Sequence, residues 1–456
     1  MKIYINIFIL FVFMASSCSK FLDEKPDQSL SQLTKLSDCQ SLLDAVTYIN
    51  FSRFPSLLEL GTDDFYLSET SYNSLNDFDR ANYIWAKEPI YSNINRNTEW
   101  MGPYVPVMYS NVVLEEIGDI PVSSNEEKKQ RDEIIGAALF IRAFSFYQLA
   151  QVYGEPYTNV SQTPSLGIVL RLSSNFNDLS IRYSVQETYK QIIDDLEKAI
   201  PILPVDVVVQ TRPSKSAAYT LLARVQMVKG DYTEAMRYAS EALALKSELL
   251  DYNDVKIDDA IPFQRFNKET IYFATSGGSA MLGVNNAVID EELYVSYSSD
   301  DLRKSIYFQQ NTTGNISFKG HYHGEVNSSF FVGLTTSELY YIMAECLVRN
   351  NSLSEAAQWI NKINKKRMKK GSKTDIALED YEDPLEIVLS ERRKELLFRG
   401  VRWSDLRRLN QDPRYEKTVV RRVGNETFSL KPNDLRYTYM IPQSVIEITG
   451  IEQTKR

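Results

Sequence analysis

The densest group of ionisable side chains is the segment 390–410, SERRKELLFRGVRWSDLRRLN. Glu391 and Glu395 are four residues apart, a spacing that could place two carboxyl groups together for acid–base chemistry. The same segment holds one further acid and six arginines, namely Asp405, Arg392, Arg393, Arg399, Arg402, Arg407 and Arg408. Surrounding positive charge lowers the pKa of a carboxyl group, which is the opposite of what a general acid requires. We therefore predict a partly buried ion-pair network between helices, in which replacing arginine by lysine costs stability.

The chain has two histidines and three cysteines, too few for the common zinc sites unless carboxylates take part. His321 and His323 flank Tyr322 and would lie on one side of an extended segment. No third ligand follows nearby in the sequence, so a polar loop is the better interpretation than a metal site. The glycine-containing stretch 275–283 lacks the Lys-Ser/Thr pair of a phosphate-binding loop. We expect neither a metal nor a cofactor.

Aromatic side chains in polar stretches could bind sugars, because a flat ring packs against the C–H groups of a pyranose while polar neighbours bind its hydroxyls. Tyr72 lies in LSETSYNSLND, Trp85 in ANYIWAK, and Tyr294 and Tyr297 in EELYVSYSSDD. We take these four as candidate ligand-binding residues in loops, with packing in the core or on the surface as the alternative for each. The last pair has the acidic neighbours Asp290, Glu291, Glu292, Asp300 and Asp301, which favour a neutral glycan over an acidic one.

Helices must position these residues, since most of the chain has helical patterning. Residues 133–151 are apolar on more than one face, which predicts a buried helix ending at Gly154. Residues 185–200 place an apolar stripe on one face before Pro201. Between the helical segments, residues 50–98, 154–183, 250–336 and 410–442 are rich in Asn, Ser, Tyr and Gly and are expected to be irregular.

An internal repeat relates residues 217–243 to residues 338–364. A shift of 121 positions aligns Tyr219 with Tyr340 and Ala223 with Ala344, and it aligns Glu234-Ala235 with Glu355-Ala356. Each copy is typical of two helices joined by a short polar turn, with small residues that let the helices approach closely. This pattern is tetratricopeptide-like, and residues 133–151 with 185–200 form a possible third pair. Generic helical hairpins are the alternative.

The N-terminus is typical of a secretory signal, with Lys2, an apolar run over residues 3–15 and small residues before Cys18. The apolar run is too short to span a bilayer. Cys18 follows the small residues as the lipid acceptor does in bacterial lipoproteins, although Ala15 stands where Leu is usual. We predict a signal peptide over residues 1–17 and lipidation of Cys18; an ordinary signal peptide with an unmodified cysteine is the alternative. Cys39 and Cys346 remain, and the sequence leaves their pairing open.

Composition excludes several function classes. The chain has 456 residues, 43% of them apolar, so it can bury a sizeable core. Its formal net charge of −9 makes it a poor non-specific ligand for nucleic acid or anionic lipid. A fold held together by disulfides is excluded, because three cysteines form at most one bridge.

Five stretches in order resemble the SusD/RagB family of outer-membrane lipoproteins. They are the start at Cys18 with FLDEKPD, residues 136–154, residues 211–235, ELYYIMAECL with EAAQWINKINKKR, and residues 390–410. The C-terminal stretch YMIPQSVIEITG also resembles the end of the family's sequences. After it, the Asn-Pro and Gln-Asn pairs usual in the family are reduced to the single residue Gln453. Similar tryptophans recur across the family with differing ligands, which makes Trp85 the weaker candidate. No ligand-binding residue carries over, because the binding loops share no motif.

The resemblance implies a mainly α fold, namely a right-handed superhelix of four tetratricopeptide-like helix pairs with a large irregular, loop-rich half packed on it. It implies a non-enzymatic protein at the outer face of the outer membrane. Such a protein delivers oligosaccharide, or in some members peptide, to a SusC-like TonB-dependent transporter and acts as the lid of that transporter. We expect a signal peptide over 1–17, a lipidated tether over 18–40 and one unit over 41–456, with halves 41–210 and 211–456. The rival hypotheses are a protein-binding helical scaffold and a lipid-anchored glycoside hydrolase, for which no convincing acid–base pair is present.

Overall fold

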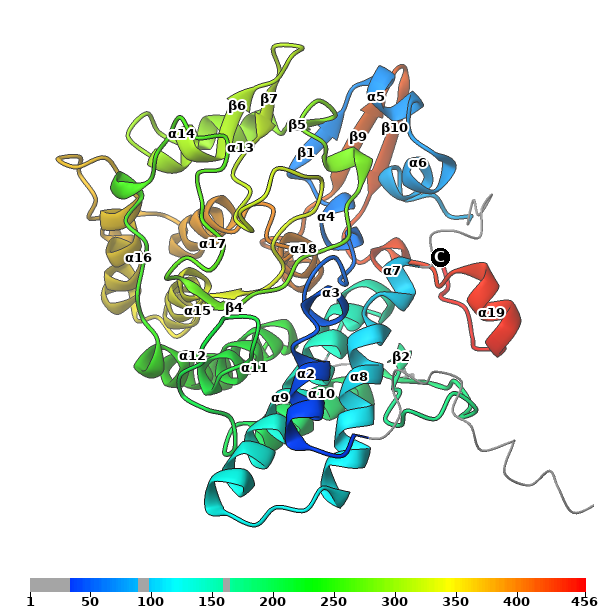
Figure 1. Ribbon diagram of the computed structural model, residues 1–456. Helices are drawn as coiled ribbons and strands as arrows, with labels where there is room; N and C mark the ends of the chain where they lie inside the picture. The colour runs from blue at the N-terminus through cyan, green and yellow to red at the C-terminus, as the bar shows by residue number, and fades with distance from the viewer. Residues whose placement is uncertain (1–32, 89–97, 159–164) are drawn as a thin grey trace, which may run out of the picture.

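The computed structural model describes residues 33–88, 98–158 and 165–456 (Figure 1). The predicted signal peptide and Cys18 lie outside these ranges. The first described helix, α2, begins at Leu36 and buries Leu36 and Cys39. The packed fold therefore begins before residue 40, where the tether was expected to end.

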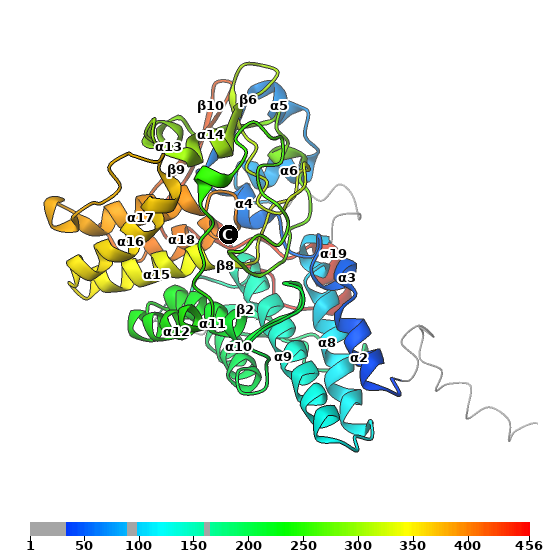
Figure 2. The same ribbon diagram turned by 60° about the vertical axis from the view of Figure 1, so that its left-hand side comes forward.

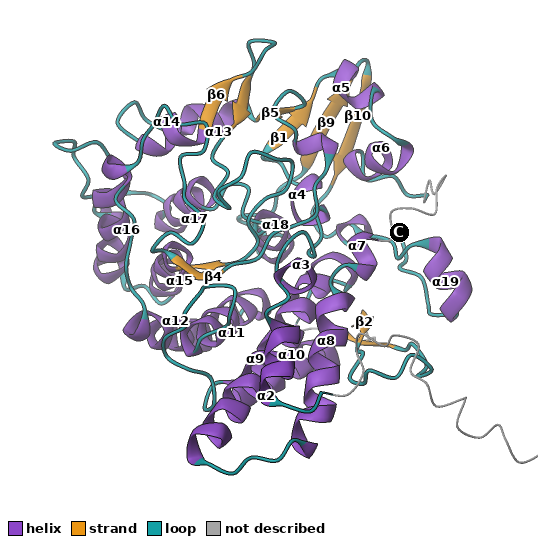
Figure 3. Cartoon of the chain, in the orientation of Figure 1, coloured by secondary structure: helices purple, strands orange, loops and turns teal. Residues whose placement is uncertain are grey.

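Long helices make up most of one half of the molecule, and Figure 3 shows most of the strands outside it, with β2 (Leu166–Val169) and β4 (Thr270–Tyr272) lying against the helices. They are α8 (Tyr104–Glu116), α9 (Asn125–Tyr153), α10 (Val185–Ala199), α11 (Lys215–Lys229), α12 (Tyr232–Leu245), α15 (Thr336–Arg349), α16 (Leu353–Arg367) and α17 (Pro384–Glu395). Shorter helices of this half are α2 (Leu36–Leu43), α3 (Val46–Ile49), α7 (Thr98–Met101), α18 (Arg402–Leu409) and α19 (Gln443–Thr449). The expectation of a mainly α fold is confirmed.

Helix α9 is the centre of the helical half. It begins eight residues before the predicted helix, because Ser124 and Glu127 form a capping box at its N-terminus. From Ile134 onward nearly every side chain is buried, as the apolar residues on more than one face predicted. Among the described residues it is the one helix long and apolar enough to cross a membrane, but 89% of its apolar window is buried inside the fold. Its packing against α8 and α10 accounts for that composition.

The two repeat copies both fold as predicted, each as two helices joined by a short turn. The α11–α12 turn contains Gly230 at φ 74°, a left-handed conformation that favours glycine, and Asp231 caps α12. In the second copy, Asn351 takes that conformation at φ 59° between α15 and α16. The pairing of α9 with α10 is also observed. Figure 2 shows α11 with α12, α15 with α16, and α17 with α18 stacked in succession.

The rest of the chain forms loops, short helices and two-stranded sheets, of which β2–β3 and β4–β8 pack against the long helices. The helices are α4 (Leu57–Leu60), α5 (Glu69–Asn73), α6 (Asp77–Tyr83), α13 (Glu291–Ser296) and α14 (Leu302–Tyr307). The antiparallel pairs are β1 (Phe65–Leu67) with β5 (Ala287–Ile289), β2 (Leu166–Val169) with β3 (Arg182–Ser184), β4 (Thr270–Tyr272) with β8 (Leu334–Thr335), β6 (Phe308–Gln310) with β7 (Ile316–Phe318), and β9 (Val419–Val423) with β10 (Glu426–Leu430). The prediction that these segments are irregular is thus correct only in outline. Local N-caps such as Ser68, Asn76 and Asp290 start short helices within them.

Candidate functional site

The charged segment 390–410 is a buried ion-pair network, as predicted. Glu395 accepts two hydrogen bonds from the Arg367 guanidinium, at 2.9 and 2.8 Å, and Arg367 also binds Glu269 at 2.7 Å. Burial alone would raise the pKa of Glu395, but the guanidinium groups of Arg367, Arg399 and Arg303 hold it at about 2. Glu391 pairs with Arg303 at 2.7 Å, and its pKa is likewise lowered. Carboxyl groups that stay ionised and paired are unsuited to act as general acids.

The histidines and cysteines are also packed into the fold. His323 is buried, and its Nε2 lies 3.0 Å from Asn327 Oδ1, while burial lowers the pKa of its imidazole to about 4. The part of the chain that the structure describes holds no group of three His, Cys, Asp or Glu side chains suited to a metal ion. Cys39 and Cys346 are both buried and free, which answers the question of their pairing.

Two of the four candidate ligand-binding aromatics are core residues. Trp85 is fully buried, donates from Nε1 to the Gly61 carbonyl at 3.1 Å and stacks under Arg421. Tyr297 is fully buried and donates its hydroxyl to the Lys394 carbonyl at 2.8 Å. Both residues lie outside helices and strands as expected, but they pack in the core, which is the alternative given for each: Trp85 follows α6 into the core, and Tyr297 turns inward at the end of α13. Neither ring has an open face for a ligand.

The other two candidates are half-buried and lie on short helices. Tyr72 is on α5 and packs its ring 5.7 Å from Tyr83. Tyr294 is on α13, with its ring edge-on to Phe308 at 5.3 Å and the Lys304 ammonium 4.6 Å from the ring centre. Neither hydroxyl has a hydrogen-bond partner among the described residues. Both can therefore contact a ligand, although Lys304 covers part of Tyr294.

Sequence reasoning missed a third tyrosine, Tyr66, which is the most open of the group. It is the middle residue of β1, and its side chain is 44% exposed while Phe65 and Leu67 on either side are buried. The alternation of apolar and open positions in a strand could have revealed it, but three residues are too short a run to be recognised. Burial, together with the nearby carboxylates of Glu291 and Asp290, raises the pKa of its hydroxyl, which therefore stays protonated and able to donate.

We call Tyr66, Tyr72 and Tyr294 the tyrosine face. Their elements are neighbours: α5 follows and contacts β1, β1 pairs with β5 with Tyr66 opposite Val288, and α13 follows β5 directly. Figure 1 shows α5, β1, β5 and α13 along the upper edge of the molecule, far from the helical repeats. The hydroxyls of the three tyrosines give this face a set of donors and acceptors beside aromatic rings, which is the combination that a sugar requires.

The charge around the tyrosine face differs in part from the prediction. Asp301 is buried and binds the Arg303 guanidinium, so it belongs to the ion-pair network and not to the surface. Asp290 caps α13 by accepting from the Leu293 amide at 3.0 Å. Glu291 and Glu292 remain exposed, as does Glu69 near Tyr66 in the chain. The surface near Tyr66 is therefore still acidic.

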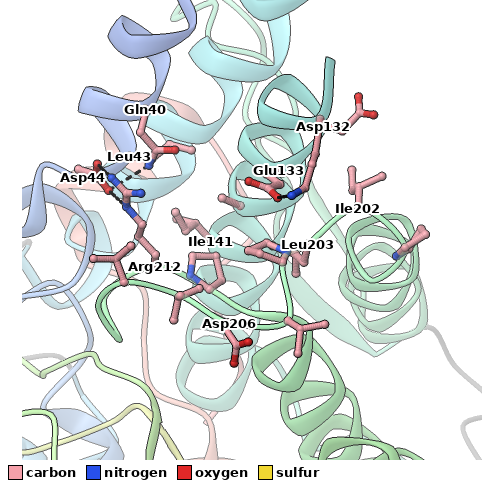
Figure 4. Close-up of a pocket in the computed structure, with 18 of the residues that line it drawn as sticks. Gln40, Leu43, Asp44, Asp132, Glu133, Ile141, Ile202, Leu203, Asp206 and Arg212 are labelled. Carbon is pink, nitrogen blue, oxygen red and sulfur yellow. Dashed lines mark hydrogen bonds and ion pairs between the residues drawn. The ribbon is translucent and has the colours of Figure 1, made fainter. Parts of the chain in front are cut away.

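A separate pocket of about 820 Å³ lies between α2, α9 and the loop 201–213 (Figure 4). Figure 4 shows Arg212 paired with Asp44, and Asp132, Glu133 and Asp206 are among the other lining residues. Its lining has several prolines and aliphatic side chains but no aromatic ring. Without a ring to stack on a pyranose, this pocket is a poorer match to a sugar than the tyrosine face.

Comparisons with known proteins identify the family. A family model described as "Starch-binding associating with outer membrane" matches residues 20–227, and the model of the SusD family matches residues 307–447. SusD-like protein P2 of Formosa agariphila is 22% identical over 411 residues, covering 75% of this chain and 76% of the relative. SusD-like protein P38 of the same organism is also 22% identical, with 90% and 93% covered.

Solved structures agree in fold. A SusD superfamily protein from Bacteroides thetaiotaomicron has a TM-score of 0.74 at 21% identity, with 92% of this chain and all of that chain covered. Surface glycan-binding protein A from Bacteroides uniformis has a TM-score of 0.71 at 16% identity, with 92% and 99% covered. The two family models together account for most of the chain. The chain belongs to the SusD/RagB family.

Proposed function

We propose that this protein is a surface glycan-binding lipoprotein that captures oligosaccharide on its tyrosine face. Membership of a carbohydrate-binding family supports a glycan-binding role. The observation that carries the choice of surface is the exposed ring of Tyr66 beside the half-buried rings of Tyr72 and Tyr294, whose hydroxyls have no partner among the described residues. The ion-paired carboxylates of α17 supply no acid–base pair, which favours binding over catalysis.

Binding would combine stacking with hydroxyl recognition. The ring of Tyr66 offers the most open surface, and its protonated hydroxyl donates to a sugar oxygen. The carboxylates of Glu291 and Asp290 accept from sugar hydroxyls and repel carboxylated sugars, so we propose a neutral glycan. Tyr72 and Tyr294 extend the contact along the same edge.

The test has two steps. A panel of immobilised neutral polysaccharides first shows which one retains the protein. An oligosaccharide of that polysaccharide is then titrated against wild type and variants. Tyr66→Ala should weaken binding by about 1–2 kcal/mol, by analogy with the stacking of a base on an aromatic ring, and Tyr72→Ala or Tyr294→Ala by less. Tyr48→Ala is the matched control, because Tyr48 is 47% exposed but lies on α3 in the helical half. Equal affinity of wild type and Tyr66→Ala, or a loss in Tyr48→Ala of the same size, would remove the tyrosine face from the site. Tighter binding of an acidic glycan would refute the choice of a neutral one.

We further propose that the protein delivers its glycan to a SusC-like TonB-dependent transporter, acts as the lid of that barrel and is held at the outer face of the outer membrane by lipid on Cys18. Family membership supports this role. Protease accessibility of the protein on whole cells tests the orientation, and an intact protein on intact cells that is cleaved only after lysis would contradict it.

A further inference from the structure

A polar pocket of about 760 Å³ lies in the helical half, where the segment after α9, the α11–α12 turn and the end of α15 meet. We call it the repeat pocket, because Asn350 takes the position in the second repeat copy that Lys229 takes in the first. Its lining includes Tyr157, Lys229, Asp231, Tyr232, Arg349 and Asn350. Figure 2 shows α15 and α17 between the α11–α12 pair and α13, so this pocket is separate from the tyrosine face. Its volume is in the range of small-molecule sites, about 300–1,000 Å³.

The two cations of the repeat pocket do not make it a site for anions. Arg349 binds Glu345 through two contacts, at 3.0 and 2.9 Å, and its guanidinium lies 4.3 Å from the centre of the Tyr232 ring. Lys229 and Arg349 are the last residues of α11 and α15, where the helix carbonyls carry partial negative charge. Asp231 adds a full negative charge to the lining. Two cations thus face two acids and two helix C-termini, and the pocket attracts neither sign of charge strongly.

Several polar atoms of the pocket have no hydrogen-bond partner within the part of the chain that the structure describes. They include the hydroxyls of Tyr157 and Tyr232 and the side-chain amide of Asn350. They also include one oxygen of Asp231, whose other oxygen accepts from the Glu234 amide at 3.1 Å. Burial raises the pKa of the Tyr232 hydroxyl, which therefore stays protonated and able to donate at neutral pH. Donors and acceptors are thus available together in one pocket.

A neutral sugar matches this lining better than other classes of ligand. Each sugar hydroxyl both donates and accepts, so it can use the hydroxyl, amide and carboxylate groups of the pocket at the same time. An apolar ligand would leave these groups without partners when it displaced water from them, which is costly. An ion would gain little, because the charges of the lining are balanced. The rings of Tyr157 and Tyr232 are half-buried, so hydrogen bonds contribute more to recognition here than stacking does.

We propose that the repeat pocket is a second binding site for a neutral glycan, in addition to the tyrosine face. Asp231 accepts from sugar hydroxyls, Asn350 binds them through both atoms of its amide, and the two tyrosine hydroxyls donate to sugar oxygens. Two sites on one chain strengthen the hold on a long polysaccharide beyond the affinity of either site, because the second contact forms within an existing complex. Only the choice of the test oligosaccharide rests on the proposed function.

The test is calorimetric titration of the full-length chain with an oligosaccharide of the neutral polysaccharide that retains the protein. The triple variant Tyr157→Phe, Tyr232→Phe and Asn350→Ala removes three of the open polar groups and keeps both rings. The removed groups form no hydrogen bond within the described residues, so we expect an unchanged melting temperature. Asn350→Ala alone changes one exposed side chain, and it should weaken the same site if the triple variant is unstable. The matched control is Tyr381→Phe, because Tyr381 is 40% exposed and lies outside both sites.

We expect two binding sites per chain in the wild type and in the control. The triple variant should weaken one of them about tenfold or more, and Tyr66→Ala should weaken only the other. Wild-type binding in the triple variant, or a single site that Tyr66→Ala alone weakens, would overturn the inference. Tighter binding of a galacturonic acid oligomer than of the neutral oligosaccharide in Tyr66→Ala would also overturn it. A single site that only the triple variant weakens would support the repeat pocket and contradict the tyrosine face.

Discussion

Replacing Arg408 by lysine tests whether buried arginines hold the helical half together. Arg408 lies on α18 and reaches Glu345 on α15 through two parallel hydrogen bonds, at 2.6 and 2.8 Å. A third bond at 2.8 Å joins its Nε to Asp405. All three side chains are buried, and both carboxyl groups have a lowered pKa. Lysine keeps the positive charge but has a single nitrogen, which cannot span both Glu345 oxygens and Asp405.

The magnitude follows from the number of bonds lost. A hydrogen bond to a charged group contributes about 1.5–3 kcal/mol, and a lysine at this position would keep about one of the three. The oxygens left without donors are buried, which adds a desolvation cost, while relaxation of the lysine recovers part of the loss. We expect the free energy of unfolding to fall by about 3 kcal/mol, close to the range for breaking a buried ion pair.

Urea unfolding followed by tryptophan fluorescence measures this change. The matched control is Arg414→Lys, because Arg414 forms the same kind of two-bond pair with Asp412, at 3.1 and 2.7 Å, on the exposed surface. The control should leave the unfolding midpoint unchanged, since surface pairs contribute little. If the two variants shifted the midpoint equally, or if Arg408→Lys had no effect, burial of the ion-pair network would not be the source of stability that we infer.

Three further predictions concern other parts of the chain. Burial lowers the pKa of His323 to about 4 in the folded protein, so the unfolded state binds more protons between pH 4 and 6.5. The free energy of unfolding should therefore fall by up to about 3 kcal/mol as the pH drops through that window, and His323→Gln should flatten the pH dependence of the melting temperature. Ala235, like Ala223, is fully buried where α11 meets α12. Ala235→Leu should overpack this contact and lower the free energy of unfolding by about 1–3 kcal/mol. An unchanged melting temperature would show that the contact is loose. Cys18→Ala should move the protein from the membrane fraction to the soluble fraction, and retention after a high-salt wash in cells lacking the transporter would mean that another group anchors it.

The helical half was predictable because its signals are local. Apolar periodicity, the small residues of the repeat and the Gly230-Asp231 turn indicate helices whose bounds in the structure differ from the expected ones by only a few residues. The start of α9 is the exception. Residues 125–132 are polar throughout, and only the capping box at Ser124 and Glu127 shows that the helix begins there.

The tyrosine face was only partly predictable, because burial of an aromatic residue depends on contacts distant in the chain. Tyr294 and Tyr297 have equivalent polar neighbours in the sequence, yet Tyr297 reaches the Lys394 carbonyl 97 residues away and is buried, while Tyr294 stays at the surface. Trp85 is covered by Arg421, which no local pattern relates to it. Composition therefore predicts that aromatic residues could bind sugar but not which of them face solvent.

The charged segment 390–410 connects the helical half with the tyrosine face. Arg393 binds Asp64 at 2.8 Å and Arg402 binds Asp63 at 2.7 and 2.9 Å, and these two aspartates immediately precede β1. Burial alone would raise the pKa of Asp63, but Arg393 and Arg402 hold it well below its usual range, so the Asp63 carboxylate stays ionised. The strand that carries Tyr66 is thereby fixed to α17 and α18 by buried charge. Arginines of the same segment as Glu391 and Glu395 thus hold the proposed binding surface in place, because a short two-stranded sheet has too little core of its own to do so.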